Sequence, residues 1–362
     1  MISYIARRVA ASMAVIYVVI SISFYMIRLM PGNAVDFVTA QLQSQGGLSP
    51  AAIQAKISLI YGLQTNAPLW KQYFSYVGHA FEGNFGQSST NPGVSVIHII
   101  AGALPWTLFV VGVALLISFV IGILLGTFLA AKRDSKVAKA VTVAVSVLAA
   151  FPNYLIALIL LYLLADLHPI FPVGGAYSLG VPVGFNLSFI GSIFLHGFIP
   201  ITAYVVTAVG SWALSMKGSV VTQLSSEHVR AAESWGLSSR RVLQSYVGRN
   251  SMLPQVTMLA LSVGSMFGAS VFIETFTSYP GIGYYLITSV DSRDYTVMMG
   301  CFILICVAVV LSNFVVDLLY PAVDPRITRP SGSRRGARGG AQGKVPVLGV
   351  EGGTPAMTKE SA

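Results

Sequence analysis

The sequence predicts an all-α membrane protein with six transmembrane helices, and three observations lead to this fold class. Of the 362 residues, 54% are hydrophobic and only 10% are charged, whereas soluble domains carry about 25% charged residues. The mean hydropathy is +0.73. Six apolar runs are each long enough to cross the roughly 30 Å hydrocarbon core of a bilayer. They cover about residues 9–29, 103–131, 140–165, 190–215, 255–275 and 298–320.

The first apolar run follows Arg7 and Arg8, as the apolar region of a secretory signal peptide would. Its apolar stretch is longer than that of a signal peptide, and no A-x-A-like cleavage site follows it. We therefore expect residues 1–29 to form an N-terminal segment with a retained transmembrane helix.

The basic residues predict the orientation of the spans, because Lys and Arg concentrate in cytoplasmic loops. If the N-terminus is cytoplasmic, 18 of the 22 Lys and Arg residues fall on the inner side. These are Arg7, Arg8, Lys132, Arg133, Lys136, Lys139, Lys217, Arg230, Arg240, Arg241, Arg249, Arg326, Arg329, Arg334, Arg335, Arg338, Lys344 and Lys359. The outer side keeps only Lys56, Lys71, Arg293 and, at a membrane edge, Arg28. Both termini are thus predicted to be cytoplasmic, and the net charge of +9 is a topology signal rather than a nucleic-acid-binding surface.

The segments outside the spans differ in length and composition. The first outer segment, about 30–102, has polar turn signals and short amphipathic pieces such as Pro68–Phe81, and predicts a small extracytoplasmic subdomain of short helices. The segment 166–189 is rich in Pro and Gly and is expected to be irregular. Residues 103–328 form the membrane core. The tail 329–362 has too few large apolar residues to bury a core and is expected to be a disordered cytoplasmic segment.

The sequence contains no recognisable catalytic motif. Gly343-Lys344 is followed by Val345, so no phosphate-binding loop is formed, and H-E-x-x-H and G-x-S-x-G are absent. Cys301 and Cys306 lie five residues apart in one apolar run and would point to different faces of a helix. We expect no catalytic residue, no disulfide, no metal site and no cofactor in this chain.

Three ionisable residues, Arg28, Glu274 and Asp317, fall within or beside apolar runs. Charged residues within spans are candidates for function. Each of the three lies near the end of its run, where a side chain can reach interfacial water, so a structural role is favoured.

Glu274 is the best functional candidate of the three, because it adjoins an outer segment with the sequence TFTSYPGIG. Pro280, Gly281 and Gly283 predict a tight turn there. The turn is a candidate outer gate, and a simple helix cap is the competing interpretation.

A polar segment at about 216–254 separates the fourth and fifth runs, and the predicted topology places it in the cytoplasm. Ser225 or Ser226 can cap a first helix, which Gly236 would end. Ser238 can cap a second helix. The segment therefore predicts two short helices joined at Gly236.

Small residues characterise the first of these helices and the position after it. Ala231, Ala232 and Gly236 would let another surface approach the backbone closely. A docking helix and a solvated surface loop are both compatible with this pattern.

The stretch HVRAAESWGLSSRRVLQSYVGRNSMLP resembles the cytoplasmic EAA loop of ABC-importer permeases, in the form found in the oligopeptide/dipeptide/nickel branch. The resemblance covers about residues 1–328, with several motifs in the order of that branch. The other stretches that carry it are IARRVAASMAVIYVVISISFYMIRLMPGNAV, YGLQTNAPLWKQYFSYVGHAFEGNFGQSS, FIETFTSYPGIGYYLITSVDSRDYTVMMG and VVDLLYPAVDPRI.

The loop departs from the wider superfamily pattern in one position. Arg230 stands where the general motif has Glu, before Ala231, Ala232 and Gly236, and the stretch from Gly236 to Pro254 is longer than in the general form. Both features are usual in the peptide branch. No acidic residue can therefore be assigned a role at position 230.

The resemblance implies a type I ABC-importer permease fold in a bacterial or archaeal cytoplasmic membrane. It implies four protein partners besides the lipid bilayer: a second homologous permease, two cytoplasmic ABC ATPase subunits that bind ATP and Mg, and an extracytoplasmic substrate-binding protein. The expected cargo is a short peptide, with an oligosaccharide or a nickel chelate as alternatives.

The resemblance also implies which residues couple the permease to its ATPase. The expected coupling residues are Ala231, Ala232, Gly236, Leu237 and Arg240. Arg230 and Glu233 are expected to make ionic contacts at the rim.

An ion-coupled secondary transporter is the alternative from a different functional class. Such a carrier predicts charges near span centres and broken spans in related halves of the chain. Here the charges lie at the ends of the apolar runs, and a docking loop is present instead.

Overall fold

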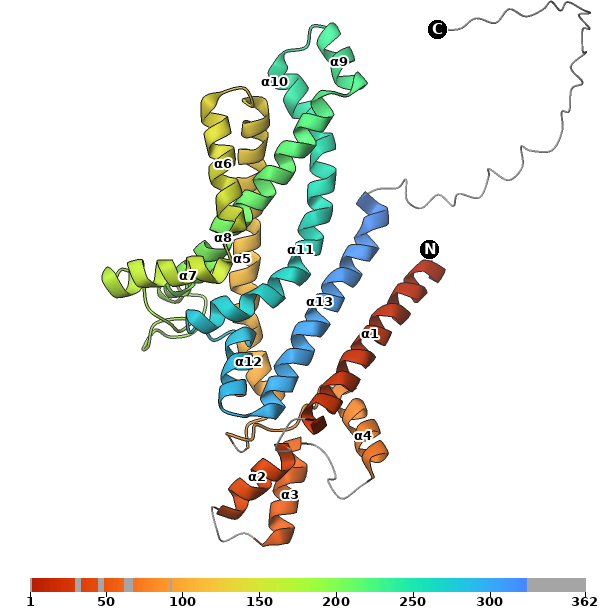
Figure 1. Ribbon diagram of the computed structural model, residues 1–362, viewed down its shortest axis with the longest axis vertical. Helices are drawn as coiled ribbons and strands as arrows, with labels where there is room; N and C mark the ends of the chain where they lie inside the picture. Colours follow the sequence, from red (N-terminus) through yellow and green to blue (C-terminus); the bar gives the residue numbers. More distant parts are fainter. Residues whose placement is uncertain (1, 30–33, 45–48, 62–67, 92, 324–362) are drawn as a thin grey trace, which may run out of the picture. The chain divides into compact units, whose positions relative to one another are not determined.

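The structure, a computed structural model, describes residues 2–29, 34–44, 49–61, 68–91 and 93–323 (Figure 1). Within these residues the chain is helical and contains no strand, apart from an isolated bridge between Gln87 and Ser95. The all-α prediction is confirmed. The predicted tail, 329–362, lies outside the described residues.

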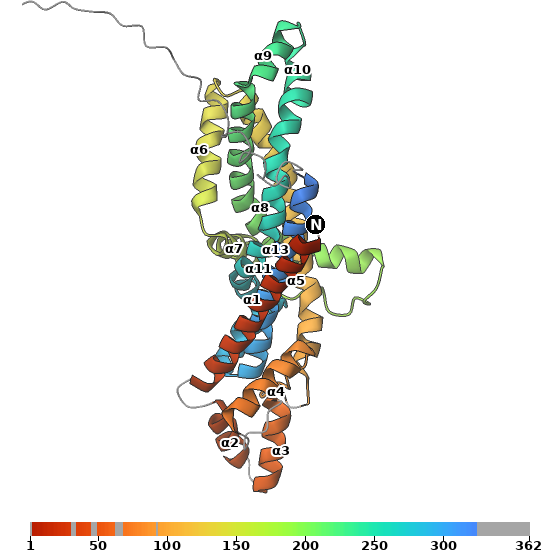
Figure 2. The same ribbon diagram turned by 90° about the vertical axis from the view of Figure 1, so that its right-hand side faces the viewer.

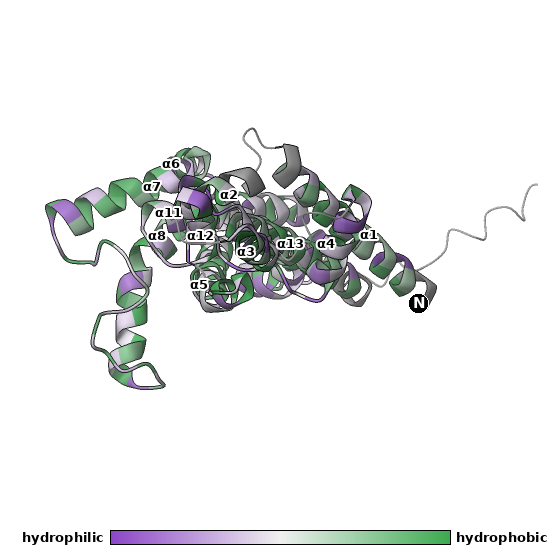
Figure 3. Ribbon diagram, turned by 90° about the horizontal axis from the view of Figure 1, so that it is seen from below, coloured by the Kyte–Doolittle hydropathy of each residue, from purple (hydrophilic) through white to green (hydrophobic). Residues whose placement is uncertain are grey.

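Five segments of the described chain are long and apolar enough to cross a membrane. Hydrophobic residues extend along all of them (Figure 3). They are α1 (Ile2–Leu29), α5 (Val96–Ala131), α8 (Leu187–Leu224), the continuous segment Ser239–Phe276, which ends in α11 (Arg249–Phe276), and α13 (Tyr295–Val323). Each contains one of the predicted apolar runs.

The predicted span over 140–165 is wrong as a single helix. The chain forms α6 (Lys136–Ala150) and then, after a break, α7 (Asn153–Leu161), which continues as η1 (Tyr162–Leu167). The two parts are bent by 94°, so the number of spans is five, or six if the bent pair counts as one. Pro152 causes the break, because a residue before proline disfavours the helical conformation, and Phe151 is extended (φ −74°, ψ 135°).

Glycines let the central helices pack at close range. A Cβ on Gly122 or Gly126 of α5 would overlap Trp212 or Ala213 of α8, respectively. Small residues at helix crossings allow such close backbone approach within membranes. Helix α8 is thus held directly against α5, and Gly210 brings it equally close to α6.

The helix bundle has two distinct ends (Figures 1 and 2). One end carries the short helix α9 (Glu227–Ser234), and we call it the α9 end. The opposite end, here called the α12 end, carries α12 (Ile282–Asp291). The irregular segment predicted at 166–189 is confirmed for residues 168–186, which contain no helix.

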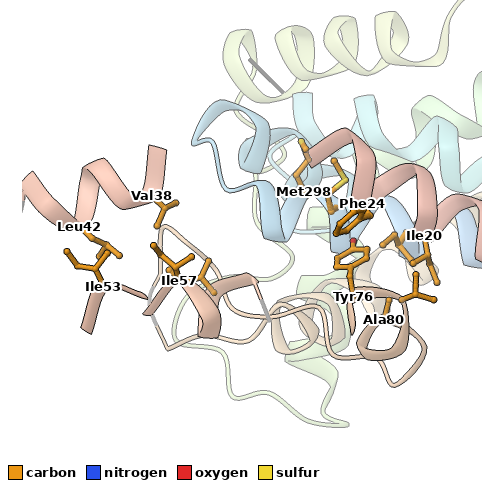
Figure 4. Packing of buried hydrophobic residues seen from close by; sticks show 13 residues of the cluster. Ile20, Phe24, Val38, Leu42, Ile53, Ile57, Tyr76, Ala80 and Met298 are labelled. Atoms are coloured by element: carbon orange, nitrogen blue, oxygen red, sulfur yellow. The ribbon is translucent and has the colours of Figure 1, made fainter. Parts of the chain in front are cut away.

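Short helices from the segment predicted to form a subdomain lie at the α12 end. Helices α2 (Ala34–Ser44) and α3 (Pro50–Tyr61) pack against each other, and Figure 4 shows their buried side chains in contact. These side chains are Val38, Leu42, Ile53 and Ile57.

Helix α4 (Leu69–Phe81) packs on α1 rather than on α2. Tyr76 and Ala80 of α4 join Ile20 and Phe24 of α1 in the same buried cluster (Figure 4). The predicted helical character of Pro68–Phe81 is confirmed.

An ion pair ties α1 to α13. Arg8 Nη1 lies 2.8 Å from Asp317 Oδ2, and both side chains are partly exposed. The pairing supports the structural role favoured for Asp317. The side chain of Arg28 lies outside the described part of the structure.

Asp294 joins the segment before α5 to the start of α13. Its carboxylate accepts hydrogen bonds from the Thr90 hydroxyl at 2.9 Å, from the backbone N–H groups of Ser89 and Val297 at 3.2 Å each, and from the Ser88 hydroxyl. Asp294 is buried, so these bonds are shielded from water.

Replacing Asp294 with Ala would leave these donors buried without an acceptor, at a cost of about 1–3 kcal/mol. We expect the Asp294→Ala variant to melt at a lower temperature than the parent protein in detergent. Asp291→Ala, at an exposed position three residues earlier, is the matched control and should melt as the parent does. Equal melting temperatures for the two variants would contradict this role of Asp294.

Candidate functional site

The polar segment between α8 and α11 forms the tip of the α9 end (Figures 1 and 2). Helix α9 is the first of the two predicted short helices. The second is not separate, because α10 (Ser239–Arg241) runs through the π-helical turn η2 (Val242–Gly248) into α11 without a break. The segment is therefore one short helix, α9, between the ends of two long ones.

Gly236 ends α9 as predicted. It adopts φ +78°, a left-handed conformation that glycine reaches without steric cost. Its N–H donates to the Glu233 carbonyl at 2.9 Å, and the Leu237 N–H donates to the Ala232 carbonyl at 3.4 Å. These two bonds form a Schellman motif, which satisfies carbonyl groups that the helix end would otherwise leave unpaired.

The inner face of α9 packs against the protein's own core. Val229 and Ala232 are fully buried in a cluster with Val220 of α8 and with Val242 and Val247 of η2. Residues three apart in a helix share one face, so both point the same way. The expectation that Ala232 presents a small surface to a partner is wrong, since its size serves the contact of α9 with the rest of the chain.

The outer face of α9 carries the other predicted residues. Arg230, Glu233 and Gly236 are exposed, and Ala231 is partly exposed. Nothing lies within 4 Å of a Cβ placed on Gly236, so the space beside this residue is open. Of the residues predicted just after α9, Arg240 is exposed, whereas Leu237 packs against the buried cluster.

Trp235 was not among the predicted site residues. It is the last residue before Gly236, and its side chain is 74% exposed at the tip of the bundle. A large aromatic residue just before a helix-ending glycine, in a polar segment, was the available sequence signal.

Polar side chains also join the base of this segment to its neighbours. Gln255 of α11 is fully buried, and its Nε2 donates to Ser219 Oγ of α8 at 3.0 Å. Asn250 Nδ2 lies 3.3 Å from His228 Nε2 of α9. Helix α9 is thus linked to both long helices that it separates.

The second candidate site lies at the α12 end. Glu274 is fully buried, and its Oε2 accepts a hydrogen bond from the Gly283 N–H at 2.8 Å. The Ile282 N–H donates to Thr107 Oγ1 of α5 at 2.9 Å. Together Glu274 and Thr107 satisfy the first N–H groups of α12, where a negative charge is favourable.

The glycines of the predicted turn make room for this carboxylate. A Cβ on Gly281 would overlap the Glu274 carboxylate, and one on Gly283 would overlap the backbone of Val271. Pro280 belongs to the same turn. The geometry agrees with the helix-cap interpretation, in which Glu274 joins α11 to α12.

Comparison with known proteins gives one family match and several relatives. Residues 122–329 match the family described as binding-protein-dependent transport system inner membrane component. The matched region includes α9 and the turn before α12.

Three relatives illustrate the similarity. The oligopeptide transport system permease protein AppB of Bacillus subtilis (strain 168) is 30% identical, over 90% of this chain and 99% of the relative. The dipeptide transport system permease protein DppB of Lactococcus lactis subsp. cremoris (strain MG1363) is 31% identical with the same coverage. The di/tripeptide transport system permease protein DppB of Pseudomonas aeruginosa (strain UCBPP-PA14) is 30% identical, again over 90% and 99%.

The family match covers more than half of the chain, and the relatives extend the similarity to nearly all of it. The multiple apolar helices of the structure agree with a multi-pass membrane component. The chain therefore belongs to the family of binding-protein-dependent transport system inner membrane components.

Proposed function

We propose that this chain is the permease subunit of an ATP-driven importer for short peptides and forms half of the translocation path with a second, homologous permease. The observation that carries the proposal is α9, a short helix with an exposed outer face on the tip of a family-matched bundle. The printed names of the relatives favour peptides over an oligosaccharide or a nickel chelate as cargo.

The outer face of α9 is the proposed docking surface for one of two cytoplasmic ABC ATPase subunits. Arg230 and Glu233 supply charges for its rim, and Trp235 supplies a large exposed ring. Trp and Arg are enriched among the residues that contribute most to binding at interfaces. ATP and Mg would be held by the ATPase subunits, and this chain would convert their closure into movement.

The packing of α9 supports this coupling role. Its inner face is buried through Val229 and Ala232 against α8 and η2, and η2 continues directly into α11. A force on the outer face of α9 would therefore reach two long helices at once, because close-packed interiors transmit displacement. Both helices extend to the α12 end (Figure 1).

The basic residues support an orientation with the α9 end in the cytoplasm, and with both termini there. The α12 end would then face the extracytoplasmic substrate-binding protein that the family description implies. In this orientation the turn at Glu274 and Gly281 lies on the outer side, where a gate to the path would lie.

Transport in proteoliposomes tests the proposed function. The chain, its partner permease and the two ATPases should take up a short peptide only when the binding protein and ATP are both supplied. Peptide uptake by this chain alone, driven by an ion gradient, would instead establish the secondary-transporter alternative.

A matched pair of glycines tests the docking surface. Gly83, after α4, has φ +77° and ends its helix with the same pair of hydrogen bonds as Gly236, and both have open space beside them. Valine at either position imposes a similar backbone strain, on the order of 1–3 kcal/mol.

We expect Gly236→Val to lower ATPase binding or to uncouple ATP hydrolysis from transport, with normal membrane insertion. Gly83→Val should insert normally and bind the ATPase as the parent does, because it lies at the opposite end of the bundle. Co-purification of the ATPase and the ratio of peptide transported to ATP hydrolysed measure both effects. Normal coupling in Gly236→Val would contradict the assignment of α9.

A further inference from the structure

Helix α4 presents three different faces along its length. One face is buried against the protein and includes Gln72, Tyr76 and Ala80. A second face carries an aromatic stripe with the 4- and 7-residue spacing of one helix side, and its members are Trp70 (61% exposed), Phe74 (64%) and Phe81 (46%). The third face is exposed and polar, and its members are Lys71, Ser75 and Glu82.

A helix on the surface of a water-soluble domain has an apolar face toward the core and a polar face toward water. Helix α4 has an additional apolar face that no part of the described chain covers. Three environments would satisfy it: protein on one side, water on another, and an apolar medium on the third. A helix at the surface of a bilayer meets these three environments.

The contact with α1 places α4 at the level of the membrane. Tyr73 Oη lies 2.7 Å from Ser21 Oγ and 2.7 Å from Tyr17 Oη. The membrane-spanning part of α1 is Ile5–Met26. At about 1.5 Å per residue, Ser21 and Tyr17 lie about 7 and 13 Å inside the Met26 end of this span. Tyr73 therefore reaches α1 within its span and not beyond it.

The aromatic stripe is continuous with the exposed surface of α1. Tyr25, which is 55% exposed on α1, stacks on Tyr73 with ring centroids 6.0 Å apart. Tyr73 in turn meets Phe74 edge-on at 5.2 Å. Aromatic side chains gather where membrane and water meet, because one part of the ring system is apolar and the other is polar.

Lys71 fits the boundary of such a layer. Its Nζ lies 5.4 Å from the centroid of the Trp70 ring, so the charge is held beside the aromatic stripe on the polar side of the helix. Lysine at an interface extends its ammonium group toward the polar headgroups while its stem covers apolar surface.

We propose that α4 is an interfacial helix, with Trp70, Phe74 and Phe81 inserted among the phospholipids of the leaflet at the α12 end. Lys71 and Ser75 then face headgroups and water, and the opposite side anchors α1. This assignment separates α4 from the water-exposed subdomain predicted for residues 30–102. It depends on the membrane spans of the chain and not on the identity of the cargo.

Photo-crosslinking in the intact transporter tests the proposal. Benzoylphenylalanine, an aromatic residue that reacts with neighbouring C–H bonds on illumination, replaces Phe74 in one variant and Ser75 in another. Each complex is illuminated in native membranes with its partner subunits, and mass spectrometry identifies what is attached to α4.

We expect phospholipid adducts at position 74, in severalfold greater yield than at position 75. Ser75 is the matched control, because it is exposed on the next position of the same helix but belongs to the polar face. An adduct of position 74 with the second permease or with the binding protein would overturn the proposal. Lipid yields that are equal at the two positions, or absent at position 74, would also overturn it.

Discussion

The close contact between α5 and α8 is the constraint on which the rest of the bundle depends. Gly122 and Gly126 leave no room for a side chain between the two backbones, so α8 has one position against α5. Lipid does not drive helices together as water does, and close packing of small residues supplies the association instead. Helix α8 then carries α6 through Gly210 on one side and leads into α9 at its end.

Two buried carboxylates fix the opposite end of the bundle. Glu274 closes the corner between α11 and α12, and Asp294 closes the corner between α12 and α13. A buried charge is costly unless hydrogen-bond donors surround it, and helix N-termini provide such donors from the backbone. The two corners are thus held by bonds that need no second charged side chain. A fixed α12 end and a packed α9 end give the intervening helices the stiffness that coupling requires.

Much of this architecture was predictable from local sequence, and the exceptions share a cause. Span length follows from apolar composition, and the end of α9 follows from the left-handed conformation that Gly236 favours. The break at Pro152 had a local signal that the apolar run around it concealed. The inward orientation of Ala232 had none, because a small side chain fits both a partner and a core. The level of α4 depends on a contact between Tyr73 and Ser21, which no local pattern reveals.

The central claim is that α9 and α8 move as one body when the ATPases close. A distance between spin labels on exposed Ser234 of α9 and exposed Ser211 of α8 measures this directly in the assembled transporter. The distance should stay the same without nucleotide and with ATP bound to hydrolysis-deficient ATPases, while transport-competent closure takes place. A shift or a marked broadening of this distance on ATP binding would show that α9 moves independently, and would contradict the account.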